Sequence, residues 1–254
     1  MKLLIDLGNT RLKWAFLARG ELRAGGVFAH GRAPLDVPLR REWAELRGIE
    51  AVLVASVVAP SVEDELDAWV RERFGLHAGF LRSPAAALGL RNAYAQPTRL
   101  GIDRFLAMAA LHDASPRAQV LVGVGTALTA DALDGGGRHH GGLILPSPHV
   151  MREAVLGSTA RVAALGGHWS EMPADTADAV VSGSLYAALG AIDRFVAAAA
   201  RRLDAVPAVV LTGGGAEELA PLLPDAERAH DLVLRGLALW AEDPSAPTPR
   251  NRPY

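Results

Sequence analysis

Residues 2–16 read KLLIDLGNTRLKWAF, an apolar run followed by a short polar turn and then by apolar residues at every second position. Alternation of this kind indicates a strand with one buried face, so the segment predicts a β-hairpin. The turn, at residues 6–11, contains Gly8, which permits backbone angles that let successive amides face an anion. The hairpin therefore carries a candidate anion-binding turn.

The second half of the chain repeats this pattern. Residues 120–133 read VLVGVGTALTADAL, again an apolar run, a glycine turn and a second strand-like run. Aligning Gly8 with Gly125 gives an offset of 117 residues in a chain of 254. The repeat predicts two domains of one topology, at residues 1–117 and 118–243, with a ligand site in the cleft between the halves.

The other segments favour an α/β fold. Residues 51–59 form a β-branched run typical of a buried parallel strand, and residues 61–74 have helical spacing. Further helices are predicted at 103–112, 177–201 and 216–223, and a strand at 208–212. The tail at residues 244–254 is rich in proline, so we expect it to be disordered.

Composition excludes several classes of function. The formal net charge of −2 provides no basic surface for nucleic acid. The two lysines, Lys2 and Lys13, do not stand in a Walker A loop. The chain has no cysteine, which fits a reducing compartment, and no apolar run near the roughly 18 residues of a membrane helix. We therefore expect a cytoplasmic protein that binds neither nucleic acid nor membranes.

The first turn has side chains suited to phosphate binding. Asn9, Thr10 and Lys13 can all donate to phosphate oxygens. An ionised Asp6 can only accept, and it would hold the water shell of a magnesium ion. The alternative interpretation is an ordinary hairpin turn, in which Asp, Gly and Asn are also common.

Two segments of the second half suit other parts of a nucleotide. Thr126 follows the second glycine turn and could donate to a phosphate oxygen. Gly213, Gly214 and Gly215 follow a buried strand, and their missing side chains would let adenosine lie against the backbone. The alternative for these glycines is a tight connection between a strand and a helix.

Asp103 and Arg104 are candidates for binding a small hydroxy acid. Asp103 could accept the hydroxyl proton while Arg104 holds a carboxylate. The alternative is that Asp103 only complements the N-terminus of the predicted helix.

Five motifs in order carry a family resemblance: DLGNTRLKW at 6–14, GIDR at 101–104, GTALTAD at 125–131, the turn GGLILP at 141–146 and LTGGG at 211–215. Together they resemble the type III pantothenate kinases, also called the Bvg accessory factor family. The resemblance implies a duplicated ribonuclease H-like fold of the actin-like ATPase superfamily, with mixed central sheets flanked by helices. It also implies cytoplasmic homodimers that use ATP and magnesium, and often a monovalent cation, to phosphorylate pantothenate as the first step of coenzyme A synthesis.

The resemblance also implies roles for residues. ATP would be contacted by Asp6, Leu7, Gly8, Asn9, Thr10, Arg11, Leu12, Lys13 and Thr126. The pantothenate site would be lined by Tyr94, Gly101, Ile102, Asp103, Arg104 and Thr176, with Asp103 as the proton acceptor.

Two positions depart from the family pattern. The Asp that begins the family's second loop, and that is its usual monovalent-cation ligand, is replaced by Gly123. We therefore expect activation by potassium or ammonium to be weak or absent. Ser147 replaces a family glycine, which predicts a different backbone path there.

Two alternatives stay open: a kinase of the same superfamily with another small substrate, and a degenerate, non-catalytic accessory or regulatory protein.

Overall fold

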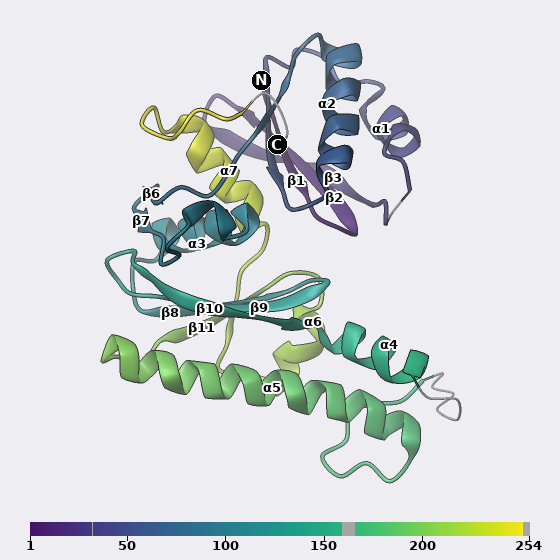
Figure 1. Cartoon of the computed structure of the whole chain (residues 1–254), viewed down its shortest axis with the longest axis vertical. Helices are drawn as coiled ribbons and strands as arrows, with labels where there is room; N and C mark the ends of the chain where they lie inside the picture. Colours follow the sequence, from purple (N-terminus) through teal and green to yellow (C-terminus); the bar gives the residue numbers. More distant parts are fainter. Residues whose placement is uncertain (32, 159–165, 251–254) are drawn as a thin grey trace. The chain divides into compact units, whose positions relative to one another are not determined.

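The computed structural model describes residues 1–31, 33–158 and 166–250. The chain divides into two compact units (Figure 1). Unit 1 comprises Met1–Pro116 and Asp231–Tyr254, and unit 2 comprises Arg117–His230. The first boundary lies one residue from the predicted boundary after residue 117.

Unit 1 is built on a five-stranded sheet in the order β3-β2-β1-β4-β5. Its strands are β1 (Lys2–Leu7), β2 (Arg11–Ala18), β3 (Glu21–Ala29), β4 (Ala51–Ser56) and β5 (Ala78–Phe80). The first three strands are antiparallel neighbours, whereas β4 runs parallel to β1 and β5 runs parallel to β4. The predicted opening hairpin is thus confirmed.

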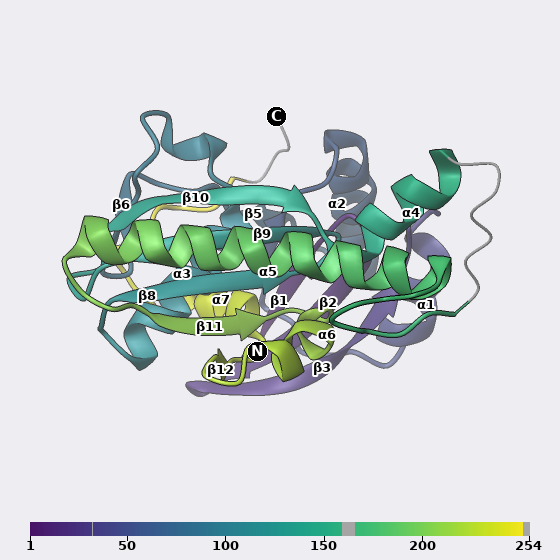
Figure 2. The same cartoon turned by 90° about the horizontal axis from the view of Figure 1, so that it is seen from below.

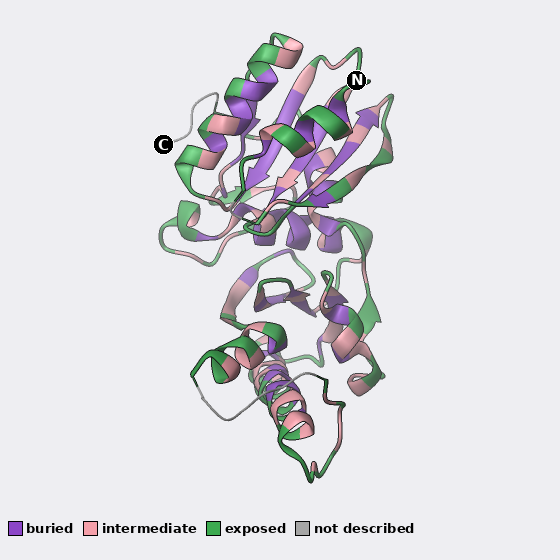
Figure 3. Cartoon of the chain, turned by 90° about the vertical axis from the view of Figure 1, so that its right-hand side faces the viewer, coloured by how far each residue is buried: buried purple, intermediate pink, exposed green. Residues whose placement is uncertain are grey.

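One face of this sheet is covered by α1 (Asp36–Trp43) and α2 (Pro60–Phe74). Leu3, Ile5 and Leu7 of β1 belong to this core, where the ring of Trp43 meets those of Trp14 and Trp69 edge to face. Figure 3 shows buried residues both on the strands and on the helices that cover them. Because side chains alternate along a strand, Asp6 lies on the opposite face of the sheet.

That opposite face is covered by α3 (Ile102–Ala114) and α7 (Leu232–Glu242). The two helices approach so closely that a side chain at Gly236 would collide with the carbonyl oxygen of Leu106. The rings of Phe105 and Trp240 meet edge to face at 6.4 Å. The prediction that residues up to 243 belong to the second domain is therefore wrong for α7, because its apolar face is buried in unit 1.

The tail is also ordered as far as the structure describes it, which corrects the expectation of disorder for 244–250. Arg250 and Phe80 exchange two backbone hydrogen bonds, of 2.9 and 3.0 Å, across the free edge of β5. Trp240 donates its indole N–H to the carbonyl of Pro247 at 3.1 Å. Residues 251–254 lie outside the described residues, so the expectation there stays a prediction.

Unit 2 has a second five-stranded sheet, in the order β10-β9-β8-β11-β12. Its strands are β8 (Gln119–Val124), β9 (Ala127–Leu133), β10 (His139–Pro146), β11 (Ala208–Thr212) and β12 (Glu227–Arg228). As in unit 1, the first three strands are antiparallel and the last two are added in parallel. This shared strand order confirms the predicted duplication and the mixed sheets.

The long helix α5 (Thr176–Leu203) packs on one face of the second sheet (Figure 2). The described remainder of unit 2 consists of α4 (Pro148–Ser158), α6 (Ala216–Leu219) and the 3-10 turn η2 (Ala220–Leu222). The predicted turn at 141–146 is wrong, because these residues extend edge strand β10 beside β9. Leu143 and Leu145 of this strand pack against the core of unit 2, whereas Ile144 between them is exposed, as expected for an edge strand with one buried face.

Candidate active site

The first loop joins β1 to β2 and is fixed from both sides. The amide of Gly8 donates to the carbonyl of Arg11 at 3.0 Å, which closes the turn. The end of β3 supports it, since the His30 ring nitrogen Nε2 lies 2.8 Å from the carbonyl of Gly8 and the His30 amide donates to Thr10. The loop is therefore held in one shape with Asn9 and Thr10 exposed at its tip.

The residues predicted to contact ATP differ in what they can offer from this loop. The side chains of Leu7 and Leu12 are completely buried in the core, so only their backbone could serve a ligand. Asn9, Thr10 and Arg11 are exposed. The loop therefore presents polar side chains on an apolar base.

Asp6 and Lys13 form a cross-strand pair on the face opposite α1 and α2. They are direct partners in the antiparallel register of β1 and β2. Desolvation by burial raises the pKa of Asp6 to about 7, the carboxylate of Asp103 adds to the rise, Lys13 opposes it, and the carboxylate of Asp231 adds to it. Asp6 thus lies within electrostatic reach of two other carboxylates, an environment that favours a bound cation.

Asp231 lies beside the candidate site and was missed by sequence reasoning. It immediately precedes α7 in a left-handed conformation, φ +53°, and its carboxylate lies 3.7 Å from the Lys13 ammonium. It is distant from the loop in sequence, and no motif marks it. His30 was missed for the same reason, because its role depends on where β3 ends.

Asp103 stands in the first turn of α3, as predicted. Its oxygen Oδ1 accepts a hydrogen bond from the amide of Arg104 at 2.8 Å. A Cβ atom at Gly101 would lie 2.5 Å from the same oxygen, so glycine leaves room for the carboxylate in this position. One carboxylate oxygen thus complements the helix N-terminus, as the alternative predicts, and a role of Asp103 in binding a substrate stays a prediction.

Most residues predicted for pantothenate gather beside Asp103 in unit 1. Arg104 is buried, and its guanidinium donates to the Tyr94 hydroxyl at 3.3 Å. Ile102 is only 2% exposed and serves the core instead of a ligand surface. Thr176 is the first residue of α5 in unit 2, where Asp175 caps the helix, and its role in binding pantothenate stays a prediction.

The second loop is a tight hairpin between β8 and β9. The amide of Gly125 donates to the carbonyl of Ala127 at 2.9 Å, and Thr126 is exposed at the tip. Gly123 precedes the loop, and a Cβ atom there would lie 2.9 Å from the hydroxyl of Thr129. The space where the family's aspartate would begin is therefore partly filled by a threonine.

The glycine run lies directly beside this second loop. Its strand, β11, is parallel to β8, with Thr212 paired to Gly123. A side chain at Gly213, φ +93°, would collide with the backbone of Val124, and the Gly215 amide donates to the Val124 carbonyl at 2.9 Å. The alternative of a tight connection accounts for these two glycines. The run and Thr126 nevertheless share the carboxyl edge of two parallel strands, the usual ligand-binding edge of α/β sheets.

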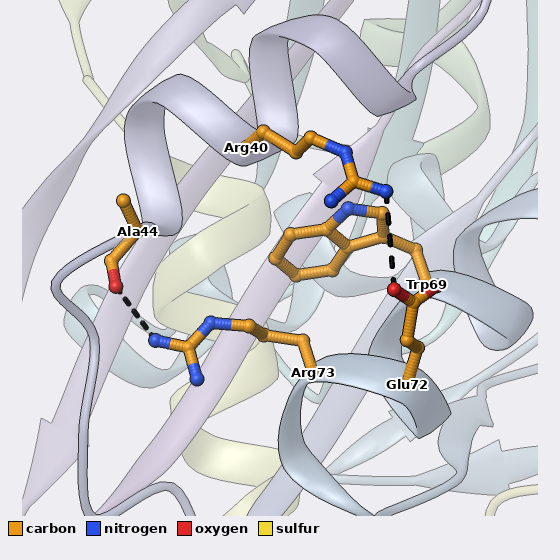
Figure 4. A pocket seen from close by; sticks show the side chains of 5 residues that line it. All are labelled: Arg40, Ala44, Trp69, Glu72 and Arg73. Atoms are coloured by element: carbon orange, nitrogen blue, oxygen red, sulfur yellow. Dashed lines mark hydrogen bonds and ion pairs between the residues drawn. The ribbon is translucent and has the colours of Figure 1, made fainter.

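A pocket of about 340 Å³ lies elsewhere in unit 1, between α1 and α2 (Figure 4). Arg40 pairs with Glu72 at 3.8 Å across it, and Arg73 donates to the carbonyl of Ala44. Its helices cover the sheet face opposite Asp6. The pocket is therefore not part of the candidate site.

No ready-made metal cage is found among residues 1–31, 33–158 and 166–250, where no three His, Asp or Glu side chains are grouped to hold an ion.

Ser147 is buried and immediately precedes α4, and its hydroxyl accepts from the amide of Val150 at 3.4 Å. Serine therefore caps the helix at this departure from the family pattern.

Comparison with known proteins identifies the family. The family model described as type III pantothenate kinase matches residues 2–198. A type III pantothenate kinase of Stenotrophomonas maltophilia (strain R551-3) is 44% identical over 240 residues, covering 94% of this chain and 96% of the relative. That of Xanthomonas axonopodis pv. citri (strain 306) is 42% identical over 244 residues, covering 96% and 98%.

Solved structures share the fold at low sequence identity. A Campylobacter jejuni protein assigned to the Baf family of transcriptional activators superposes with a TM-score of 0.62 at 22% identity, covering 95% of this chain and 98% of that one. A 2-dehydro-3-deoxygalactonokinase-type protein of Sinorhizobium meliloti gives 0.56 at 16% identity, covering 98% and 99%. Fold, motifs and near-complete coverage agree, and the chain belongs to the type III pantothenate kinase family.

Proposed function

We propose that this protein transfers the γ-phosphoryl group of ATP to the 4′-hydroxyl of pantothenate, the first step of coenzyme A synthesis. The observation that carries the proposal is the grouping in unit 1 of a rigid phosphate loop, Lys13 and the carboxylate of Asp103. Phosphoryl transfer needs mainly an aligned acceptor oxygen and neutralisation of spread charge. This group supplies both.

The nucleotide is held by loop amides and by donor side chains. Unit 1 offers Asn9, Thr10 and the Lys13 ammonium as donors. Unit 2 offers the Thr126 hydroxyl, and its glycines Gly213, Gly214 and Gly215 would let adenosine approach the backbone. Asp6 would hold magnesium through water, which fits the cation-favouring carboxylates around it. Magnesium, when bound with ATP, neutralises charge on the transferred group.

The acceptor alcohol is oriented by Asp103. Carboxylates are weak bases toward alcohols, so in a loose transition state the proton leaves late and Asp103 acts first as a positioner. The Arg104 guanidinium, with Tyr94 beside it, would bind the pantothenate carboxylate. The fixed position of Asp103 over Gly101 would then set the direction of the hydroxyl.

We also propose that the active form is a cytoplasmic homodimer. Helix α5 is long and apolar enough to cross a membrane by length and composition, and 28% of its most apolar window is buried. Leu185, Ala188 and Ile192 fix it to the core of unit 2, which argues for a helix of a globular domain. Its outer face exposes Tyr186, and covering such a face with a second copy would remove apolar surface from water.

The reaction is tested by ADP release from purified protein with ATP and magnesium. Release that requires pantothenate, and that is not supported by a panel of other small alcohols and sugars, is the expected result. Equal release with and without pantothenate, or preference for another acceptor, would overturn the assignment. Sedimentation of the same sample tests the dimer, and a monomer at enzyme concentrations with full activity would overturn that part.

A further inference from the structure

The segment between β5 and α3 has little regular structure, yet it carries Tyr94 and leads to Asp103. It contains the two-residue strands β6 (Ala86–Ala87) and β7 (Leu90–Arg91) and the 3-10 turn η1 (Pro97–Arg99). Such short elements provide few backbone hydrogen bonds. Something else must fix the segment if it is to orient a substrate.

The side chain of Asn92 makes those connections. Its amide nitrogen Nδ2 donates to the carbonyl of Pro84 and to the carbonyl of Pro97, each at 3.1 Å. Its oxygen Oδ1 accepts from the amide of Tyr94 at 3.0 Å. Because Nδ2 faces two carbonyls and Oδ1 faces an N–H, the flipped amide would lose all three hydrogen bonds. One side chain thus joins the start of the segment, Tyr94 and η1.

Each of these connections leads toward the candidate site. Tyr94 contacts the guanidinium of Arg104 through its hydroxyl. The turn at Pro97 is followed by Leu100, which is 1% exposed and anchors the chain immediately before Gly101. Moving the turn would therefore move the residues that make room for the Asp103 carboxylate.

No other residue type of this length offers two donors and an acceptor. Aspartate is isosteric but brings only acceptors, so its oxygen would face the carbonyls of Pro84 and Pro97 without a hydrogen. Serine can still accept from the amide of Tyr94 in a local turn but cannot join both carbonyls. The two substitutions at Asn92 therefore remove the double donation in different ways.

We propose that Asn92 is a positioning residue for the acceptor substrate: its amide locks the segment from Pro84 to Pro97 so that Tyr94 and Arg104 meet the carboxylate of pantothenate. It acts through Tyr94 and the turn, without contact with ATP. The identity of the acceptor rests on the proposed function, whereas the locking of the segment does not.

The test compares Asn92→Asp and Asn92→Ser with wild type in steady-state kinetics. Asn92→Asp is expected to raise the KM for pantothenate by about tenfold or more, and Asn92→Ser by about threefold, while the KM for ATP changes less than twofold. Asp243→Ser is the matched control, since Asp243 also accepts from a backbone amide two residues on, at Ser245, in unit 1 but outside the segment. It should leave both KM values unchanged.

Two outcomes would overturn the proposal. One is a wild-type KM for pantothenate in both Asn92 variants, and the other is an equal rise in the KM values of both substrates together with a lowered melting temperature. A double-mutant cycle with Tyr94→Phe adds a check, because the effects on the KM for pantothenate should be less than additive if Asn92 acts through Tyr94.

Hydrogen exchange separates this proposal from the assigned reaction. Peptides from residues 84–100 should exchange faster in Asn92→Asp than in wild type, with α3 and unit 2 unchanged, whether or not any substrate is present. Unchanged exchange would overturn the locking role even if the enzyme phosphorylates pantothenate. Faster exchange in Asn92→Asp, found together with a wild-type protein that does not phosphorylate pantothenate, would overturn the assigned reaction alone.

Discussion

Asp6 shows how the site manages charge at the level of a single residue. Its neighbours include two further carboxylates, Asp103 and Asp231, and a single ammonium, that of Lys13, among the groups that shift its pKa. Burial is the largest cause of the rise in the pKa of Asp6 to about 7, and the two carboxylates add to it, because ionising all three acids without a further cation is unfavourable. A magnesium ion would reverse that preference.

This raised pKa predicts a pH-dependent stability. Between about pH 4 and pH 7 the folded chain keeps the proton on Asp6 while the unfolded chain has released it, so the contribution of Asp6 to stability falls as pH rises through this range. Asp6→Asn removes the effect. Urea unfolding without magnesium or nucleotide should therefore show Asp6→Asn gaining stability relative to wild type between pH 5 and pH 8. The same difference in unfolding free energy between Asp6→Asn and wild type at pH 5 and at pH 8 would contradict the raised pKa of Asp6.

Gly101 provides a second test at the residue scale. A methyl group there would lie 2.5 Å from Asp103 Oδ1, although the backbone angles, φ −54°, suit alanine. Gly101→Ala should displace the carboxylate and lower kcat by about tenfold or more, with the KM for ATP unchanged. Gly157→Ala is the control, because nothing lies within 4 Å of its added Cβ atom. Wild-type turnover in Gly101→Ala would show that the position of Asp103 is unimportant.

At the scale of elements, the junction of α7 with β2 links the returning chain to the phosphate loop. Asp231 is 59% exposed and Lys13 is 34% exposed, so their ion pair is partly screened by water. Asp231→Asn keeps a residue that tolerates φ +53° but removes the charge. Without its partner, the Lys13 ammonium is less well held in position for the phosphates of ATP. The KM for ATP should therefore rise, by up to about fivefold, because an exposed ion pair contributes little energy.

Asp204→Asn is the matched control for this prediction. Asp204 ends α5 with φ +50°, almost the same backbone conformation, and belongs to unit 2. It should leave the KM for ATP unchanged. A lower KM for ATP in Asp231→Asn would mean that Asp231 acts chiefly by repelling phosphate.

The start of the second loop predicts the response to monovalent cations. Gly123 offers no charged ligand, and the Thr129 hydroxyl fills part of the space beside it. Potassium or ammonium should therefore activate turnover weakly or not at all when compared with tetramethylammonium at equal ionic strength. Strong activation that persists in Gly123→Ala would show that the ion binds elsewhere.

At the scale of the whole molecule, the sequence predicted what depends on local patterns. The opening hairpin, the repeat in unit 2 and the helix at 177–201 were predictable because their periodicity is strong and their turns carry glycine. The positions of the two loops and of Asp103 were predictable because each occupies a strand end or a helix start, whereas their binding roles stay predictions.

The residues that depend on distant contacts were not predictable in this way. Helix α7 has a strong apolar face, but only the fold shows that this face packs on α3 in unit 1. The tail carries proline and looked unable to pair, yet Arg250 adds a bridge at the open edge of β5. Asp231, at the start of α7, lies beside Lys13, and His30, at the end of β3, lies beside the carbonyl of Gly8. Neither proximity can be read from a local pattern.

The central claim is that Asp103 aligns the acceptor hydroxyl beside an independent nucleotide-binding loop. The most direct measurement is the turnover of Asp103→Asn with ATP, magnesium and pantothenate, together with the Kd for a non-hydrolysable ATP analogue. The account predicts kcat lowered by roughly 10²-fold or more with the Kd largely kept. Near-normal turnover in Asp103→Asn would contradict it.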